Sequence, residues 1–484
     1  MTDRKLPHPL ISCIPLAVLI GLLAIVITLF GSDSLSGGSQ VALIMGMAVC
    51  IFISMTFYHV PWKEFEQQMN KTMGGIFITL LILLSVGMLS GSWMVSGVVP
   101  TLIYYGVQML SPKFFLISAC AICALVSLLS GSSWTTIATI GVALLGIGQA
   151  LGIADAWTAG AIISGAYFGD KMSPLSDTTI LASSAVRVDI FKHIRYMMHT
   201  TVPTITITLI IFLIAGFGHG AASGGIHVEE FTHGLSATFN ISPWTLLVPV
   251  FTGILIAKRV PSVIVLFASS VMAGIMALVL QPHLLTEIAA DTSLSTAGAL
   301  TKGLVITYYG STAIDTGSSA LNDLVSTGGM AGMLNTIWLI ICAMCFGAAM
   351  VASGMIHSIT GVILRWVRTR FSLVSSTVVT GLLMNIATGD QFISIVLSAD
   401  MFREVYDREG FEPRLLSRTT EDAVTVTSVL VPWNTCGMTQ ATVLGVPTMV
   451  YLPYCFFNYL SPLMTMFIAA IGWKITRRQK VETA

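Results

Sequence analysis

Long apolar runs separated by short polar connections dominate the chain. A run of about 20 apolar residues can cross a bilayer as a helix, and runs of this kind recur throughout the sequence. Counting shorter runs beside glycine and proline interruptions as half-crossings, we expect an all-α polytopic membrane protein with eleven to thirteen membrane segments. The supporting runs are 9–30, 40–58, 74–89, 114–151, 156–186, 200–217, 243–257, 262–280, 330–350, 371–401, 416–431 and 448–473.

Composition agrees with a membrane location. Hydrophobic residues make up 55% of the 484 residues and charged residues only 10%, whereas about 25% of a typical soluble chain is charged. The 23 basic and 23 acidic residues balance, so nothing indicates a nucleic-acid partner. The first run exceeds the roughly 7 to 15 apolar residues of a cleaved signal peptide, and we interpret it as a transmembrane helix.

The eight cysteines lie mostly inside apolar runs. The two C-x-x-C pairs begin at Cys120 and Cys342 and have no histidine nearby, so they do not resemble a metal or redox site. Small packing residues are the better interpretation. We expect no cofactor.

Two interruptions recur at one offset in the two halves of the chain. Gly131 and Gly389 each divide an apolar run, and 389 minus 131 is 258; Pro174 in FGDKMSPLSDTT and Pro432 in VLVPWNTCG are separated by the same number. Unwound backbone survives in a membrane only around a protein-lined cavity, and paired breaks are typical of repeated transporter folds. We therefore predict repeats in residues 1–218 and 243–484, with discontinuous helices, joined by an extracytoplasmic linker at 219–242.

Basic residues indicate that the repeats are inverted, because cytoplasmic loops accumulate Lys and Arg. Segment 403–418 carries four arginines and its counterpart 145–160 carries none, whereas segment 187–195 is basic and its counterpart 445–453 is not. Equivalent loops would then lie on opposite sides of the membrane.

The same rule predicts re-entrant hairpins and the positions of the termini. Arginines flank the Gly389 break on both sides, so the chain should enter and leave the membrane on the cytoplasmic side there. Basic residues near both ends of the chain place both termini in the cytoplasm. The topology between residues 258 and 329 stays open.

The breaks carry the candidate chemistry. A charge at the bilayer centre costs about 2.5 to 3.5 kcal/mol on insertion scales, so the acidic and hydroxyl residues of segment 168–179 need a partner ion. Carboxylate, hydroxyl and freed carbonyl oxygens suit sodium, and helix N-termini at a break favour anionic groups. The candidate ion- or substrate-binding residues are Gly131, Ser132, Ser133, Thr135, Asp170, Lys171, Ser176, Asp177, Thr178, Gly389, Asp390, Asn434 and Thr435, with Asp177, Asp390, Ser132 and Asn434 as sodium ligands.

Each repeat supplies one carboxylate at a break, Asp177 or Asp390. An acid of this kind can bind sodium when ionised and carry a proton when neutral, which would couple the two ions. Asp170 and Lys171 could equally form a local ion pair. For the acids near the basic loop, namely Asp400, Glu421 and Asp422, a solvated or ion-paired face is the expected environment.

Four strings resemble the NhaC-type sodium/proton antiporter family: GSSWTTIATIGVALLGIGQALG, SGAYFGDKMSPLSDTT, SSALNDLVSTGGM and LVPWNTCG. The similarity runs in order from about residue 74 to residue 462. It implies a multi-pass antiporter of the bacterial inner membrane that forms a homodimer in the lipid bilayer, with inverted repeats and re-entrant hairpins. Some relatives exchange organic anions such as malate and lactate. Members often carry Asn where this chain has Ile180.

Sodium/proton exchange by alternating access is therefore the expected function. The alternative is a sodium- and proton-coupled exchanger of small organic acids or amino-acid-like substrates, because Lys171 and the aromatic residues Trp134, Tyr167 and Trp433 could build an organic pocket near the breaks. Packing and interface anchoring are the favoured roles for these aromatics.

Two other classes of protein fit less well. FGD and TGD match half of an intramembrane aspartyl protease signature, but Tyr167 and Ala387 replace its first glycine, and neither H-E-x-x-H nor G-x-S-x-G occurs. We therefore do not expect an enzyme. A channel is disfavoured because paired breaks suit alternating access.

Overall fold

The computed structural model describes residues 6–30, 37–219, 224–312, 314–317, 319–475 and 477. Within these ranges the regular structure is helical, apart from two isolated bridges. Among the described residues, nine helices are long and apolar enough to cross a membrane, or up to eleven if each of two bent pairs is one span. This confirms the all-α polytopic prediction. The predicted count also included half-crossings, such as the broken helices described below.

The first half of the chain forms helices up to the predicted linker. Its elements are α1 (Pro9–Ser12), α2 (Ile14–Phe30), α3 (Gly38–Tyr58), α4 (Trp62–Val95), α5 (Val98–Met109), η2 (Pro112–Phe114), α6 (Phe115–Ser130), α7 (Ser133–Thr136), the π-helical η3 (Ile137–Gly141), α8 (Val142–Ala150), α9 (Asp155–Met172), α10 (Asp177–Ala185), α11 (Ile190–His219) and α12 (Gly224–Thr238). The last of these lies inside segment 219–242, which therefore contains a helix.

The second half continues with helices of similar lengths. Its elements are η4 (Pro243–Leu246), α13 (Leu247–Ala257), α14 (Ser262–Leu280), α15 (Pro282–Ala289), α16 (Thr296–Tyr309), α17 (Ser319–Val325), α18 (Gly329–Gly332), α19 (Leu334–Ala352), α20 (Met355–Leu364), α21 (Arg370–Thr388), α22 (Gln391–Arg408), α23 (Pro413–Thr420), the π-helical η5 (Glu421–Thr425), η6 (Ser428–Leu430), α24 (Thr435–Leu444), α25 (Thr448–Tyr451), η7 (Leu452–Tyr454) and α26 (Phe456–Ile471).

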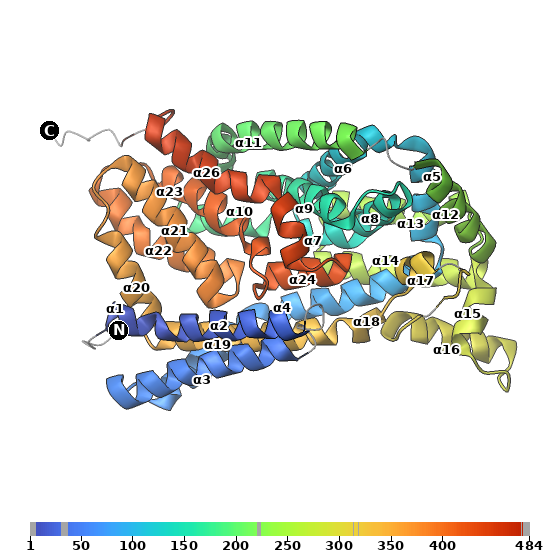
Figure 1. Cartoon of the computed structure of the whole chain (residues 1–484), viewed down its shortest axis with the longest axis horizontal. Coiled ribbons are helices and arrows are strands. Elements are labelled where there is room, and N and C mark those ends of the chain that lie inside the picture. The colour runs from blue at the N-terminus through green and yellow to red at the C-terminus, as the bar shows by residue number, and fades with distance from the viewer. Residues whose placement is uncertain are drawn as a thin grey trace.

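Apolar runs become helices because a membrane offers no water to backbone N–H and C=O groups, which must pair within the segment. Hydroxyl side chains in these runs bond back along their own helix, as Thr204 Oγ1 does to the Thr200 carbonyl at 2.8 Å. Helices α2, α3, α4 and α19 pack side by side along the long axis of the molecule (Figure 1). The first predicted membrane run corresponds to α1 and α2 and is confirmed.

Two hairpins turn back at glycines. Helix α6 ends at Gly131 and α21 ends at Gly389, and both glycines have φ of +68°, a left-handed conformation that favours glycine. The next residue caps the returning helix in each case: Ser132 Oγ accepts from the Thr135 N–H at 3.2 Å, and Asp390 Oδ1 accepts from the Ile393 N–H at 2.9 Å. Gly131 thus lies at the tip of the first hairpin and Gly389 at the tip of the second, as predicted.

Two broken helices carry the other pair of interruptions. The chain unwinds between α9 and α10 at residues 173–176, and between η6 and α24 at residues 431–434. Ser176 caps α10 and Asn434 caps α24, and these caps are again 258 residues apart. Each half therefore contains one hairpin and one broken helix with matching caps.

The two broken helices run in opposite directions. Asp155, the first residue of α9, and Gly445, which follows α24, line one cavity. Arg187, which follows α10, and Pro413, the first residue of α23, line another. The start of each broken helix thus lies beside the end of the other.

Basic residues gather at the end of the molecule that holds Arg187. Arg403 lines the same cavity as Arg187, the Arg370 side chain donates to the Ala470 carbonyl at 3.1 Å, and Tyr196 donates to the Lys474 carbonyl at 2.9 Å. Helix α1 and the C-terminal end of α26 lie toward this end as well (Figure 1).

Candidate functional site

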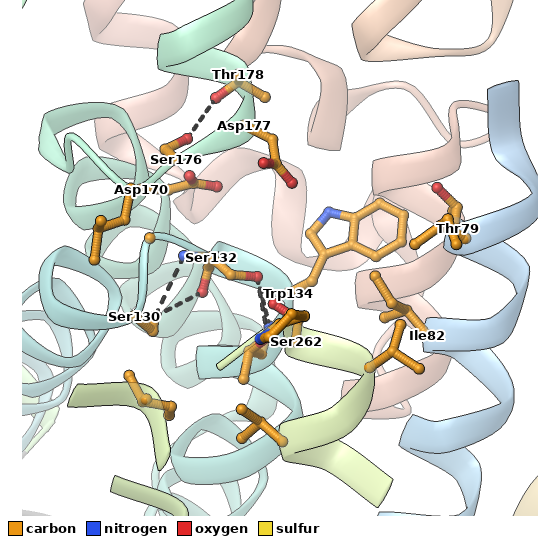
Figure 2. A pocket seen from close by; sticks show the side chains of 18 of the residues that line it. Thr79, Ile82, Ser130, Ser132, Trp134, Asp170, Ser176, Asp177, Thr178 and Ser262 are labelled. Carbon is orange, nitrogen blue, oxygen red and sulfur yellow. Dashed lines mark hydrogen bonds between the residues drawn. The ribbon is translucent and has the colours of Figure 1, made fainter. Parts of the chain in front are cut away.

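A cavity of about 420 Å³ lies where the first hairpin tip meets the first broken helix (Figure 2). Helix α4, the α13–α14 connection and the start of α22 complete its walls. Seven of the predicted site residues line it, namely Gly131, Ser132, Thr135, Asp170, Ser176, Asp177 and Thr178. Thr79, Trp134, Arg259 and Gln391 also line the cavity.

Asp170 joins the hairpin tip to the broken helix. Its side chain is 6% exposed, and its Oδ2 atom accepts hydrogen bonds from Ser133 Oγ at 2.6 Å and from the Ser133 N–H at 3.1 Å. Ser133 is the first residue of α7. The carboxylate therefore sits at a helix N-terminus, where the helix dipole favours a negative charge.

Asp177 presents its carboxylate to the cavity. It is the first residue of α10, directly after the Ser176 cap, and its side chain is exposed. In Figure 2 the carboxylate points toward the side of the cavity that holds Trp134. The hydroxyls of Ser176 and Thr178 bond to each other at 2.9 Å beside it. Carboxylate and hydroxyl oxygens of this kind suit a hard cation such as sodium.

Asp390 forms the equivalent junction in the second half. Its Oδ2 atom accepts from Thr435 Oγ1 at 3.2 Å, and the Thr435 N–H donates to the Gly389 carbonyl at 2.8 Å. Asn434 Nδ2 donates to the Asn385 carbonyl at 3.2 Å. The second hairpin tip thus docks on the second break. Asp390 is 2% exposed, and neither it nor Asn434 lines the cavity.

Comparison with known proteins shows to which family this chain belongs. Residues 165–473 match the model of the Na+/H+ antiporter family, which is more than half of the chain. The chain belongs to the Na+/H+ antiporter family. The matched region holds both breaks and the second hairpin, and therefore Asp170, Asp177, Asp390 and Asn434; the first hairpin precedes it.

Curated relatives of this antiporter-family chain align over most of their length. It is 36% identical to the Na(+)/H(+) antiporter NhaC of Alkalihalophilus pseudofirmus, covering 90% of this chain and 91% of the relative. It is 33% identical to the Na(+)/H(+) antiporter NhaC of Bacillus subtilis, covering 87% and 90%. It is 34% identical to the malate-2H(+)/Na(+)-lactate antiporter of Bacillus subtilis, covering 87% of each. These likenesses agree with the family resemblance of the sequence motifs.

Lys171 does not pair with Asp170 in this antiporter-family protein. Successive residues on a helix point about 100° apart, so Lys171 leaves the cavity side and forms an ion pair with Asp422. Its Nζ atom also donates to Ser461 Oγ at 3.2 Å. The local Asp170–Lys171 pair that the sequence allowed is therefore replaced by a contact with a distant segment.

Several residues with clear roles in the geometry were not singled out. Gln391 follows Asp390 directly and lines the cavity, so the hairpin motif was a usable signal. Arg259 and Thr79 also line it, but nothing in the apolar pattern marks them.

The acids near the basic loop differ in their environment. Glu421 and Asp422 have fully buried side chains, so a solvated face is wrong for both. Asp422 is ion-paired and Asp400 is exposed, as expected.

Proposed function

We propose that this protein exchanges sodium for protons across the membrane as a secondary antiporter. The supporting observation is the cavity in which Asp170 and Asp177 meet the hydroxyl groups of Ser132, Ser176 and Thr178 at a break inside the membrane fold. Relatives with 33% and 36% identity are named Na(+)/H(+) antiporters.

Asp177 is the proposed principal sodium ligand. Its carboxylate faces the cavity, whereas one oxygen of Asp170 is already engaged by Ser133. Hydroxyls of Ser132 and Thr178 are available at the same wall. Asp390 and Asn434 bind the second hairpin to the second break, and we assign them the task of holding that junction in position for transport.

The arrangement of the two halves supports alternating access as the transport mechanism. The broken helices run in opposite directions and their caps are separated by one offset, which supports inverted repeats in residues 1–218 and 243–484 joined by segment 219–242. A second cavity of about 360 Å³ approaches the first hairpin at Ala138 and Val142, while the first cavity approaches it at Trp134 and Thr135. The hairpin thus separates two cavities, as a gate would.

The basic end of the molecule faces the cytoplasm in this proposal. Arg187, Arg370 and Arg403 gather there, and cytoplasmic surfaces are rich in Lys and Arg. Both termini would lie on that side of a bacterial inner membrane. We also propose that the protein forms a homodimer, as the resemblance to the family implies.

A second candidate function is sodium- and proton-coupled exchange of a small organic anion. A cavity of about 420 Å³ is larger than a single ion needs, and Arg259 and Trp134 line it. A guanidinium group can bind a carboxylate, and one relative is named a malate-2H(+)/Na(+)-lactate antiporter.

Purified protein in proteoliposomes with an imposed pH gradient tests both proposals. Sodium, lithium, potassium, malate and lactate are added separately, and fluorescence of a pH-sensitive dye reports proton movement. Sodium alone should dissipate the gradient if the protein is a sodium/proton antiporter. A requirement for malate or lactate would favour the organic-anion exchanger instead, and no response to any addition would contradict both.

A further inference from the structure

A group of charged side chains lies buried outside the cavity. Lys171, Arg418, Glu421 and Asp422 are each 0% exposed, and none of them lines the cavity. We call these four residues the buried charge cluster. Lys171 comes from α9 in the first half, and the other three come from α23 and η5 in the second.

Three members of the cluster are held by specific contacts. Asp422 Oδ1 pairs with Lys171 Nζ and accepts from Thr200 Oγ1 at 3.2 Å. Arg418 Nε lies 3.9 Å from the other Asp422 oxygen, and its guanidinium stacks 4.7 Å from the centre of the Tyr196 ring. These contacts link two positive charges to one carboxylate.

Neither carboxylate oxygen of Glu421 has a hydrogen-bond partner within the described parts of the chain, and the three guanidinium nitrogens of Arg418 lack one as well. Glu421 is the first residue of the π-helical turn Glu421–Thr425. The hydroxyl of Thr425 on the same turn makes no hydrogen bond of good geometry either, but it is close enough to interact with the Glu421 carboxylate. Turns of this kind occur frequently at functional sites.

Helix packing alone does not require these charges. At the offset of 258 residues, Arg418, Glu421 and Asp422 correspond to Gly160, Ile163 and Ser164, all in α9. The broken helix of the first half is therefore built without charged residues at these positions. Lys171 likewise corresponds to Val429 in the second half, so none of the four charges is repeated, and the repeated architecture does not explain them.

The formal charges of the buried charge cluster and the adjacent Asp170 show why Glu421 is unusual. Lys171 and Arg418 supply two positive charges, and Asp170 and Asp422 supply two negative ones. Glu421 is a fifth group, and it interacts electrostatically with Lys171, Asp170 and Asp422. A buried ionised carboxylate without hydrogen bonds is strongly disfavoured. The cluster together with Asp170 is neutral when Glu421 carries a proton.

Other titratable groups near the π-helical turn belong to the elements that pack against it. Five helices contact the turn, namely α10, α21, α22, α23 and α26. Of these, α26 carries no Asp, Glu, Lys, Arg or His. Helix α11 adds His193, which is buried and bonds through Nδ1 to Ser417 Oγ at 2.8 Å. The charged residues and tyrosines on these packed elements are Asp177, Arg370, Asp400, Arg403, Glu404, Tyr406, Asp407, Arg408, Arg414 and Tyr459.

We propose that Glu421 carries the exchanged proton and that Lys171 couples it to sodium bound beside Asp170. On proton binding, one carboxylate oxygen of Glu421 forms an O–H bond and the charge changes from −1 to 0; release breaks that bond and returns the proton to water. Sodium at the cavity adds one positive charge next to Asp170, which neighbours Lys171. The added charge favours ionised Glu421, and protonated Glu421 disfavours sodium. Mutually exclusive binding of the two cations is the requirement for antiport.

This inference rests on the proposed sodium/proton exchange and refines it, because it assigns the two ions to different carboxylates. Glu421→Gln tests it in proteoliposomes, since the amide has the size of the neutral acid but cannot release a proton. The matched control is Glu404→Gln, which alters an exposed carboxylate on α22. Two rates are measured: sodium-driven proton flux, and exchange of radioactive sodium against unlabelled sodium.

We expect the proton flux of Glu421→Gln to be at least about tenfold lower than that of the wild type. Its sodium/sodium exchange at saturating sodium should stay within about twofold of the wild-type rate. Its sodium half-saturation should stay at the low-pH value of the wild type at every pH. Glu421→Asp keeps a titratable group and should retain proton flux with a displaced pH profile. Glu404→Gln should behave as wild type.

Two results would overturn the inference. One is wild-type proton flux with an unchanged pH profile in Glu421→Gln. The other is loss of sodium/sodium exchange together with proton flux in a Glu421→Gln protein that is folded and inserted, because a group that binds only the proton is not needed for sodium turnover. If the wild-type protein itself moves no protons in response to sodium, the proposed function fails instead, whatever the variants do.

Discussion

Ser133 and Asp170 connect the first hairpin to the first broken helix. Ser133 Oγ lies 2.6 Å from Asp170 Oδ2, and the Ser133 N–H donates to the same oxygen at 3.1 Å. The carboxylate is thereby shared between the tip of one membrane element and the break of another. Any movement of the hairpin during transport must therefore keep this contact or exchange it for another ligand, such as a cation.

The first prediction concerns this contact. Ser133→Ala removes a hydroxyl that donates to a buried charged group, an interaction worth about 1.5 to 3 kcal/mol. We expect a lower melting temperature and a sodium half-saturation raised by about tenfold. Ser164→Ala is the control, because Ser164 Oγ is buried without a partner in the described structure. Equal behaviour of the two variants would show that the Ser133–Asp170 contact is unimportant.

The second prediction compares the two hairpin tips. A Cβ at Gly131 would lie 2.7 Å from the Leu175 backbone, whereas at Gly389 it would meet Ala343 Cβ at 3.2 Å and the Trp433 carbonyl at 3.3 Å. Both glycines have φ of +68°, which costs a non-glycine residue about 1 to 2 kcal/mol. Gly131→Ala should therefore reduce melting temperature and exchange rate more than Gly389→Ala.

Gly253 in α13 provides the control for these substitutions. A Cβ there meets nothing within 4 Å and the residue has no positive φ. Gly253→Ala should leave thermal stability and exchange unchanged. An effect of Gly253→Ala as large as that of Gly131→Ala would mean that general helix packing, rather than tip geometry, limits the protein.

The third prediction tests the buried ion pair. Removing one partner of a buried pair leaves an uncompensated charge and costs about 3 to 5 kcal/mol. Lys171→Met and Asp422→Asn should each lower thermal stability strongly, and the double variant should be more stable than the sum of the two effects predicts. Strictly additive losses in the detergent-solubilised protein would contradict the pairing.

Sequence patterns located the breaks because their signals are local. Gly131, Gly389, Asp170 and Asp177 stand out as glycines or charges within apolar runs, and the first cavity forms around three of them. The Lys171–Asp422 pair joins residues 251 positions apart, and no local pattern encodes a contact of that range.

Burial of Glu421 was missed for a related reason. It follows a stretch rich in arginine, which resembles a cytoplasmic loop, and it is the packing of α10, α21, α22, α23 and α26 around the π-helical turn that covers this segment. The predicted sodium ligands also do not lie at one place. Asp177 and Ser132 line the cavity, whereas Asp390 makes its contacts within the second half. Pairing by offset finds equivalent residues, which in an inverted arrangement do not need to meet.

The fourth prediction concerns the orientation of equivalent loops. Lys192 lies at the basic end and is exposed, and Met449 is 57% exposed near the opposite end. In a variant without native cysteines, Lys192→Cys should react with an impermeant thiol reagent only from the cytoplasmic side. Met449→Cys should react only from the other side. Labelling of both positions from one side would rule out inverted repeats.

The most direct test of sodium/proton exchange at the first break is the sodium half-saturation of proton flux, measured between about pH 6 and pH 9 in wild type and Asp177→Asn. Sodium and protons exclude each other, so the wild-type half-saturation should rise as pH falls. Asp177→Asn keeps a carbonyl oxygen but loses the charge that balances sodium. It should lose flux by at least about tenfold, or require about tenfold more sodium at every pH. A wild-type half-saturation that ignores pH, or an Asp177→Asn variant indistinguishable from wild type, would contradict the proposed exchange at this site.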